Sequence, residues 1–270
     1  MPIYESSAQG STLHMLVCER DHEMAIITAA MFNFWTGRGN RFVFHDDGTI
    51  NREISEKFAH YLPGTKMVLR READARAAEQ LKEFPGILNY RRNQIMAFKL
   101  IDVKLWGEGE RFGYIDSDVL FFGFPAAFVE ALESQRGANY FNRDLADAYV
   151  ADRLTIAEAT GFPPASRVNA GLWAMNRADI AFSKIEAWLN HPFFAPFQAD
   201  YRLDQTFISM LANASQAGAD HLPPQYDVAF GKGVTQNVCK HYVGRIRHGY
   251  ELEGLRYLLD SGSIGANSRQ

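Results

Sequence analysis

Cysteine is scarce in this chain of 270 residues, which holds only Cys18 and Cys239. Two cysteines cannot form a disulfide framework, and this usage favours a reducing, cytoplasmic compartment. No apolar run approaches the roughly 18 residues that a membrane-spanning helix needs. The opening residues, MPIYESSAQG, lack the basic and apolar regions of a secretion signal. We therefore expect no transmembrane segment and no exported, disulfide-stapled fold.

Positive charge is not in excess either. The 28 Lys and Arg residues stand against 32 Asp and Glu residues, which gives a formal net charge of −4. Nucleic-acid binding needs a basic surface, so nucleic acid is not an expected partner. Aromatic residues are plentiful at 13% of the chain, 20 of them Phe. Large rings dominate the packing of protein cores, and this content predicts a well-filled one.

The first part of the chain alternates between short apolar runs and helical patterns. We expect strands over 13–18, 41–44, 66–70 and 112–115, and helices over 24–35, 51–61, 73–84 and 92–106. Strands that alternate with helices are typical of a parallel sheet covered on both faces. The sequence therefore predicts an α/β fold.

This alternation fails after Pro125. The patterns there predict helices over 126–132, 178–189, 204–212 and 252–259, with strands over 168–176 and 239–243. Residues 134–167 give no clear assignment. No linker or composition shift separates the two parts, so a single domain with a less regular second half is expected.

Two aspartates, Asp116 and Asp118, directly follow the predicted strand 112–115. Ligands of open α/β sheets bind at the carboxyl ends of the strands. Two carboxylates one residue apart can face one hard cation, and oxygen ligands suit Mg²⁺ or Mn²⁺. A surface turn is the alternative interpretation, because Asp is common in loops and the spacing alone does not decide between them.

The segment FGYIDSDVLFFGFP, which contains this pair, resembles the strand-DxD-strand signature of glycosyltransferases with the GT-A fold. It is most similar to family 8, the enzymes like glycogenin and the lipopolysaccharide galactosyltransferases. Other segments match in the family's order: Lys99, the stretch VNAGL at 168–172, Leu203-Asp204-Gln205, and HYVGRIR at 241–247. The resemblance implies a single GT-A-like domain over 1–270, with a mixed, mostly parallel central sheet flanked by helices.

The resemblance also implies roles for individual residues. The implied metal ligands, for Mn²⁺ or Mg²⁺, are Asp116, Asp118 and His241. The implied donor-binding residues are Lys99, Asn169, Ala170, Gly171, Gly244 and Arg247. Gln205 and Asp204 are the implied catalytic residues beside the anomeric carbon. Residues 1–125 would bind the nucleotide, residues 126–260 the sugar and acceptor, and residues 261–270 would form a flexible tail.

Two departures from the family pattern bear on the donor. Arg247 replaces the usual lysine, which keeps the charge and changes the hydrogen-bond geometry. The usual nucleotide motif after the first strand is replaced by CERDH at 18–22, so uridine is implied by the resemblance alone. Plainer interpretations also exist: His241 as a core histidine, Lys99 as a snorkelling helix residue, and Asn169-Ala170-Gly171 as a turn.

These observations predict a metal-dependent, retaining glycosyltransferase with a UDP-hexose donor, acting by front-face displacement. The acceptor stays open between a glycan, a protein, a lipid-linked molecule and a small molecule, and a peripheral membrane role stays open with it. A nucleotidyltransferase is the rival enzyme, but CERDHE has no glycine to build a triphosphate loop. A catalytically silent nucleotide-sugar binding protein is the other rival. The intact Asp116, Asp118 and His241 set argues against it.

Overall fold

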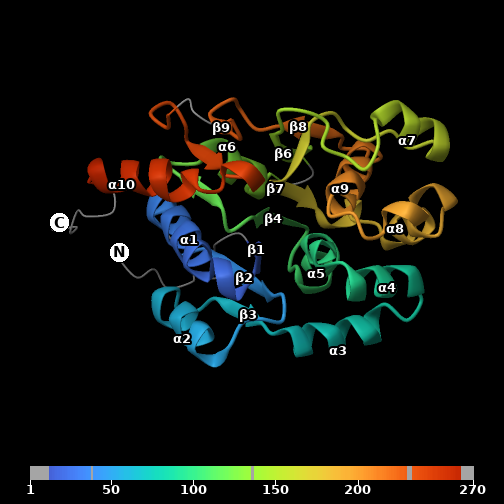
Figure 1. The fold of residues 1–270 in the computed structure, drawn as a ribbon, viewed down its shortest axis with the longest axis horizontal. Coiled ribbons are helices and arrows are strands. Elements are labelled where there is room, and N and C mark those ends of the chain that lie inside the picture. The colour runs from blue at the N-terminus through green and yellow to red at the C-terminus, as the bar shows by residue number, and fades with distance from the viewer. Residues whose placement is uncertain (1–11, 38, 135–136, 230–232, 263–270) are drawn as a thin grey trace.

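The computed structural model describes residues 12–37, 39–134, 137–229 and 233–262. Across these ranges a seven-stranded sheet has the order β3-β2-β1-β4-β7-β6-β8, and a second sheet has the order β5-β10-β9. Helices lie on both sides of the large sheet (Figure 1). The α/β class and the mixed central sheet are confirmed.

The first half of the chain builds the parallel part of the sheet. Strands β3, β2, β1 and β4 run parallel to one another. The elements are β1 (Thr12–Val17), α1 (His22–Thr36), β2 (Arg41–Asp46), α2 (Arg52–Tyr61), β3 (Lys66–Val68), α3 (Arg70–Gln80), α4 (Pro85–Asn93), a 3₁₀ helix (Ile95–Lys99), α5 (Ile101–Trp106) and β4 (Arg111–Ile115). The predicted strands and the helices at 24–35, 51–61 and 73–84 are confirmed to within a few residues.

The predicted continuous helix over 92–106 is wrong. The chain leaves helical geometry at Gln94, which has φ −128° and ψ 110°. The Gln94 side chain caps the next turn by accepting a hydrogen bond from the backbone N–H of Met96, and its amide donates to the carbonyl of Ala199. This break places Lys99 at the end of a 3₁₀ helix, facing the end of β4.

The second half reverses the strand direction. Strand β7 (Val168–Asn176) pairs antiparallel with both β4 and β6. The other elements are β5 (Val119–Phe121), α6 (Ala126–Glu133), β6 (Asn139–Arg143), α7 (Arg153–Thr160), α8 (Phe182–Leu189), α9 (Leu203–Asn213), β8 (Ala219–His221), β9 (Tyr226–Asp227), β10 (Cys239–His241), a π-helical turn (Tyr250–Leu255) and α10 (Arg256–Asp260). Strand β6 and helix α7 lie within residues 134–167, for which no secondary structure was predicted.

Aromatic side chains fill the core on both faces of the sheet. On one face Phe32 of α1 lies against Phe42 of β2 and Phe121 of β5. On the other, Tyr114 and Trp173 stack with ring centroids 5.6 Å apart. The well-filled aromatic core is thus confirmed.

Two smaller findings concern the rest of the chain. Both cysteines are free thiols. Among the residues described, no helix combines the length and apolar character needed to cross a membrane. Residues 263–270, most of the predicted flexible tail, lie outside the described residues, and the division of the domain into halves stays a prediction.

Strands β1 and β2 bring two buried histidines together. Nδ1 of His14 lies 2.9 Å from Nε2 of His45, and the rings stack. Burial, reinforced by the neighbouring His45, holds the pKa of His14 well below its usual range. Burial together with the charges of Arg91 and Lys66 lowers the pKa of His45 to about 3. Both rings are therefore neutral in the folded protein near neutral pH.

This pair predicts an acid-sensitive stability. The lowered pKa values mean that the unfolded chain binds more protons than the folded one below about pH 6.5. The contribution of the neutral histidines to the free energy of unfolding is therefore complete above that pH. It is lost as the pH falls toward about 3. In His45→Gln, the decline of the unfolding free energy between about pH 6.5 and 5 should be shallower by about 1 kcal/mol per pH unit on average. Urea denaturation across this range measures it, and parallel pH profiles for the two proteins would contradict it.

Candidate functional site

The Asp116-Ser117-Asp118 turn lies at the carboxyl end of β4, where β7 begins alongside it. The register pairs Ile115 of β4 with Leu172 of β7. The backbone N–H of Asp116 donates to the carbonyl of Gly171 over 2.7 Å. Because the two strands are antiparallel, the start of β7 meets the end of β4. The two segments predicted to bind metal and sugar therefore lie side by side.

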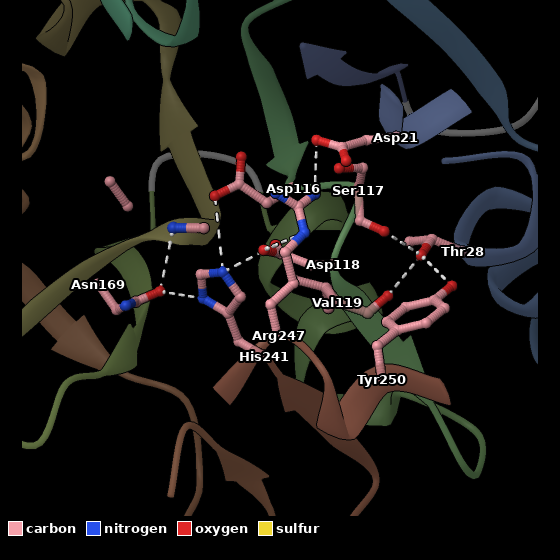
Figure 2. Close-up of polar contacts among 12 residues, drawn as sticks. Asp21, Thr28, Asp116, Ser117, Asp118, Val119, Asn169, His241, Arg247 and Tyr250 are labelled. Carbon is pink, nitrogen blue, oxygen red and sulfur yellow. Dashed lines mark hydrogen bonds and ion pairs between the residues drawn. The ribbon is translucent and has the colours of Figure 1, made fainter. Parts of the chain in front are cut away.

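The same turn is held from behind by helix α1. Oγ of Thr28 lies 2.9 Å from the carbonyl oxygen of Ser117 and 2.7 Å from that of Val119 (Figure 2). The Tyr250 hydroxyl lies 3.1 Å from Thr28 Oγ and 3.1 Å from the carbonyl of Met24. Nothing in the sequence patterns pointed to Thr28 or Tyr250. Together they fix the backbone from which both aspartates project.

His241 completes a three-residue cluster with the aspartates. Strand β10 pairs antiparallel with β5, and His241 lies opposite Val119. Its Nε2 is 3.0 Å from Oδ1 of Asp118 and 3.7 Å from Oδ2 of Asp116. One potential ligand atom from each of the three residues lies within 4.8 Å of the other two. Two carboxylates and an imidazole at this spacing can bind one divalent cation.

The hydrogen bonds around Asn169 select the tautomer of His241. Asn169 Oδ1 accepts from the backbone N–H of Gly171 over 3.0 Å, and Asn169 Nδ2 donates to the Asp144 carboxylate over 3.0 Å. These two partners fix which end of the amide is oxygen. His241 Nδ1 lies 2.8 Å from that oxygen and must therefore carry the proton. In the neutral ring this leaves the Nε2 lone pair facing the carboxylates, as a metal ligand requires.

Neighbouring charges oppose the effect of burial on the pKa values of His241 and Asp118. Burial would lower the pKa of His241, but the Asp118 carboxylate raises it above its usual value. Burial would raise the pKa of Asp118, but His241, Arg247 and Lys99 lower it. Lys99 Nζ lies 2.8 Å from Asp116 Oδ2, and the nearby carboxylates raise its pKa against the effect of burial. Lys99 is thus fixed beside the metal candidate rather than snorkelling to solvent.

Arg247 lies between two acids. Its guanidinium is 2.6 Å from Asp21 and 3.9 Å from Asp118. The 3₁₀ turn Gly244–Ile246 after β10 directs it there, and Gly244 begins that turn at φ 52°, a conformation that favours glycine. Asp21 was not predicted as a site residue. Its position just after β1, at the sheet edge where ligands bind, was the signal available for it.

Two hollows meet at this cluster. The first has a volume of about 490 Å³ and is lined by Leu16, Val17, Cys18, Glu19, Arg20, Asp21, Asp47, Thr49, Ile95, Met96, Lys99, Asp116, Ser117, Asp118 and Arg247. The second has a volume of about 270 Å³ and is lined by Met96, Lys99, Asp116, Asp118, Asp144, Ala148, Asn169, Ala170, Gly171, Tyr201, Arg202, Asp204, Gln205, His241 and Val243. Both aspartates and Lys99 face both hollows.

The predicted catalytic residues lie at the start of α9, on the wall of the second hollow. Asp204 is buried, and burial raises its pKa to about 6 although Lys99 opposes this shift. Gln205 Oε1 accepts from the backbone N–H of Ala170, and Nε2 donates to the carbonyl of Ala148, over 3.0 and 3.1 Å. Gln205 therefore anchors α9 to the start of β7.

The structure brings most of the predicted site residues to these two hollows. Gly244 lines neither; it shapes the turn that carries Arg247. Asn169, predicted to bind the donor, forms a hydrogen bond with His241, and Gln205, predicted to be catalytic, forms one with the backbone of Ala170. Their contacts with a donor sugar, like those of Ala170 and Gly171, stay predictions.

No protein-family model matches this sequence, and no curated protein does. Solved structures do. Mouse xyloside xylosyltransferase 1 matches at TM-score 0.55 and 12% identity, over 87% of this chain and 97% of its own. The galactosyltransferase LgtC, solved with donor and acceptor sugar analogues, matches at TM-score 0.53 and 15% identity, over 96% and 98%. Core-mannan synthase A of Aspergillus fumigatus, in an Mn/GDP form, matches at 0.51 and 13%, over 80% and 73%.

These similarities show the fold. The chain has the GT-A glycosyltransferase fold that its resemblance to family 8 implied. At identities of 12–15% the likeness does not carry an activity with it. The chemistry of the site depends on the residues of this chain.

A substitution at Gly171 tests whether one added methyl group displaces His241 from the two aspartates. A Cβ at this position would lie 2.0 Å from Cε1 of His241, so Gly171→Ala should push the imidazole away from the aspartates. Displacing a ligand from its orientation should weaken Mn²⁺ binding about tenfold or more. Isothermal titration with Mn²⁺ measures this.

Gly123→Ala is the matched control, because a Cβ there meets nothing within 4 Å. It should bind Mn²⁺ as the wild type does. Equal Mn²⁺ affinity in Gly171→Ala and Gly123→Ala would contradict the predicted role of His241 as a ligand.

Proposed function

We propose that this chain is a metal-dependent glycosyltransferase that moves a hexose from a nucleoside-diphosphate sugar to an acceptor. One observation carries the proposal. A cluster of two carboxylates and an imidazole stands where two hollows meet, with Lys99 and Arg247 beside it. A diphosphate must be held at such a junction when the nucleoside lies on one side and the sugar on the other. The GT-A fold supports the same assignment.

The residues fit a divalent metal. Asp116 and Asp118 supply hard oxygen ligands, and in the neutral imidazole the Asn169 contact leaves the His241 Nε2 lone pair directed at these carboxylates. A metal held there would stabilise the negative charge that grows on the diphosphate leaving group. The mannan synthase with a similar fold was solved with Mn and GDP, which supports Mn²⁺ as the ion to test first.

The two hollows suggest how a donor would lie. Residues before 126, together with Arg247, line the first hollow, which we assign to the nucleoside. The second hollow takes much of its wall from β7 and α9, and we assign it to the sugar. This arrangement agrees with a nucleotide-binding half over 1–125 and a sugar-binding half over 126–260. UDP is proposed from the family resemblance, with GDP as the alternative for the test.

We propose retention by front-face displacement. The bond from the anomeric carbon to the phosphate oxygen breaks, and its electron pair stays on the phosphate. Lys99 and Arg247 place positive charge near that group. The acceptor hydroxyl attacks from the same face, and its proton passes to the leaving phosphate oxygen. Gln205 is a poor nucleophile and is held by two backbone groups, so a covalent intermediate through it is not part of the proposal.

The proposal predicts metal-dependent donor binding and slow donor hydrolysis without acceptor. UDP or GDP with Mn²⁺ should raise the melting temperature, because a ligand that binds only the folded state stabilises it. The Asp118→Asn variant should lose this shift and the metal-dependent release of nucleoside diphosphate from the matching sugar nucleotide. Glu72→Gln removes an exposed carboxylate on α3 and should behave as the wild type.

The alternatives give different results in the same assays. A silent binding protein would show the shift without hydrolysis. A nucleotidyltransferase would release pyrophosphate from a nucleoside triphosphate and a sugar phosphate. No melting shift with any nucleotide and Mn²⁺, or a shift that Asp118→Asn retains, would overturn the proposal.

A further inference from the structure

A third hollow continues from the sugar side of the site. Its volume is about 1040 Å³, and it shares Asp144 with the second hollow. Its wall is built from the end of β6, from Arg167 directly before β7, and from the end of β8 with the chain that follows it. An acceptor that enters the sugar hollow would extend into this groove, so the side chains of the groove bear on which acceptor fits.

Two arginines supply most of the hydrogen-bond donors in this groove. Arg143 ends β6, and Arg167 stands directly before β7; the register of these strands pairs Arg143 with Val168. Both arginines are exposed and line the groove. Over the part of the chain that the structure describes, neither arginine forms an ion pair. A guanidinium presents a planar fork of donors that matches a carboxylate or a phosphate.

The acids of the groove are already hydrogen-bonded to other groups. Asp144 accepts from the backbone of Leu145 and from the amide of Asn169. Asp227 accepts from the backbone N–H groups of Val228 and Ala229, both over 2.8 Å. The negative charges of Asp144 and Asp227 therefore offset the positive charges of the two arginines. Within the described part of the chain, neither carboxylate is hydrogen-bonded to a guanidinium group, so the arginine donors stay available.

Arg167 is held in a conformation that arginine seldom adopts. Its φ of 51° makes it the non-glycine residue with a positive φ among those described. A left-handed backbone is unfavourable for a residue with a Cβ, because the Cβ crowds the neighbouring carbonyl oxygen. Asp147 Oδ1 accepts from the Arg167 N–H over 2.6 Å, and the Arg167 carbonyl accepts from the N–H of Asp144. Glycine would adopt this conformation freely, so the arginine side chain at this position comes with a local backbone strain.

Amide and hydroxyl groups complete the wall. Gln225, Gln236 and Thr235 line the groove beside the arginines. Such side chains both donate and accept hydrogen bonds, as the hydroxyl groups of a sugar do. The combination suits a polyhydroxylated chain that also carries anionic groups.

We propose that this groove binds the acceptor, and that the acceptor is a glycan bearing carboxylate or phosphate groups, which Arg143 and Arg167 bind. The inference rests on the proposed glycosyltransferase function, because it takes the second hollow as the sugar site. It narrows the acceptor from a glycan, a protein, a lipid-linked molecule or a small molecule to an acidic glycan.

Binding of defined sugars without any donor tests the groove directly. The probes are a hexamer of galacturonate, its neutral methyl ester, glucose 6-phosphate and glucose. The acidic member of at least one pair should bind saturably and the neutral member about tenfold more weakly or not at all. A preference for the galacturonate hexamer over its ester indicates a carboxylate-bearing glycan. A preference for glucose 6-phosphate over glucose indicates a phosphorylated one.

The variants Arg143→Ala and Arg167→Gly should each lower the affinity for the acidic probe about tenfold. Arg167→Gly should also leave the melting temperature unchanged or higher, because glycine relieves the positive φ. If Arg167→Gly keeps its melting temperature but loses binding of the acidic probe, unfolding cannot be the cause of the loss. Arg71→Ala removes an exposed arginine from α3, on the opposite side of the molecule in Figure 1, and should bind the probes normally.

Equal binding of acidic and neutral probes, or no binding of either acidic probe, would overturn the inference. So would acidic binding that survives both groove variants or that falls equally in Arg71→Ala. Donor hydrolysis is measured on the same samples. If hydrolysis persists while the groove shows no preference, the acceptor assignment fails and the proposed function stands.

Discussion

The confinement of Asp116, Asp118 and His241 within a few ångströms of one another is the constraint on which the site depends. Like-charged carboxylates repel, and burial makes each charge more costly. The chain offsets this with Lys99 against Asp116 and Arg247 near Asp118. Thr28 fixes the turn from one side, and Asn169 fixes the imidazole from the other (Figure 2). A divalent cation bound among these residues would reduce the repulsion between the two carboxylates and so stabilise the arrangement.

The reversal of strand direction at β7 explains how the fold brings distant segments together. A parallel neighbour of β4 would place its own carboxyl end beside Asp116. The antiparallel β7 instead offers its beginning, so residues 169–171 lie beside the metal candidate and line the second hollow, which we assign to the sugar. The same reversal leaves the ends of β6 and β8 beside Arg167, where the groove that we propose for the acceptor lies. The regions that we propose for the donor and the acceptor thus share one sheet edge.

Most of the fold could be predicted from the sequence, because the first half alternates strand and helix in patterns set by burial. The site residues could be predicted as a set because short segments matched a family in order. Three things were beyond that reasoning. The helix break at Gln94 depends on a capping contact with Met96 and a long-range contact with Ala199. Strand β6 owes its place to pairing with β7.

The third feature that the sequence could not predict is the set of hydrogen bonds that each polar residue forms. A motif indicates that a residue belongs to a site, but it does not indicate which groups that residue contacts. Asn169 was predicted to contact sugar, yet its oxygen is bonded to His241 and Gly171. The Asp21 contact with Arg247 joins segments more than two hundred residues apart and had no motif. Such partners follow from tertiary packing, which local patterns do not encode.

The central claim is that His241 and the two aspartates form one metal centre. Pulsed electron paramagnetic resonance of the protein with Mn²⁺ tests it most directly, because a nitrogen ligand leaves a ¹⁴N coupling on the metal spectrum. We expect that coupling in the wild type and its loss in His241→Gln, which has no imidazole nitrogen. Bound Mn²⁺ without nitrogen coupling in the wild type, or a coupling that persists in the variant, would contradict the account.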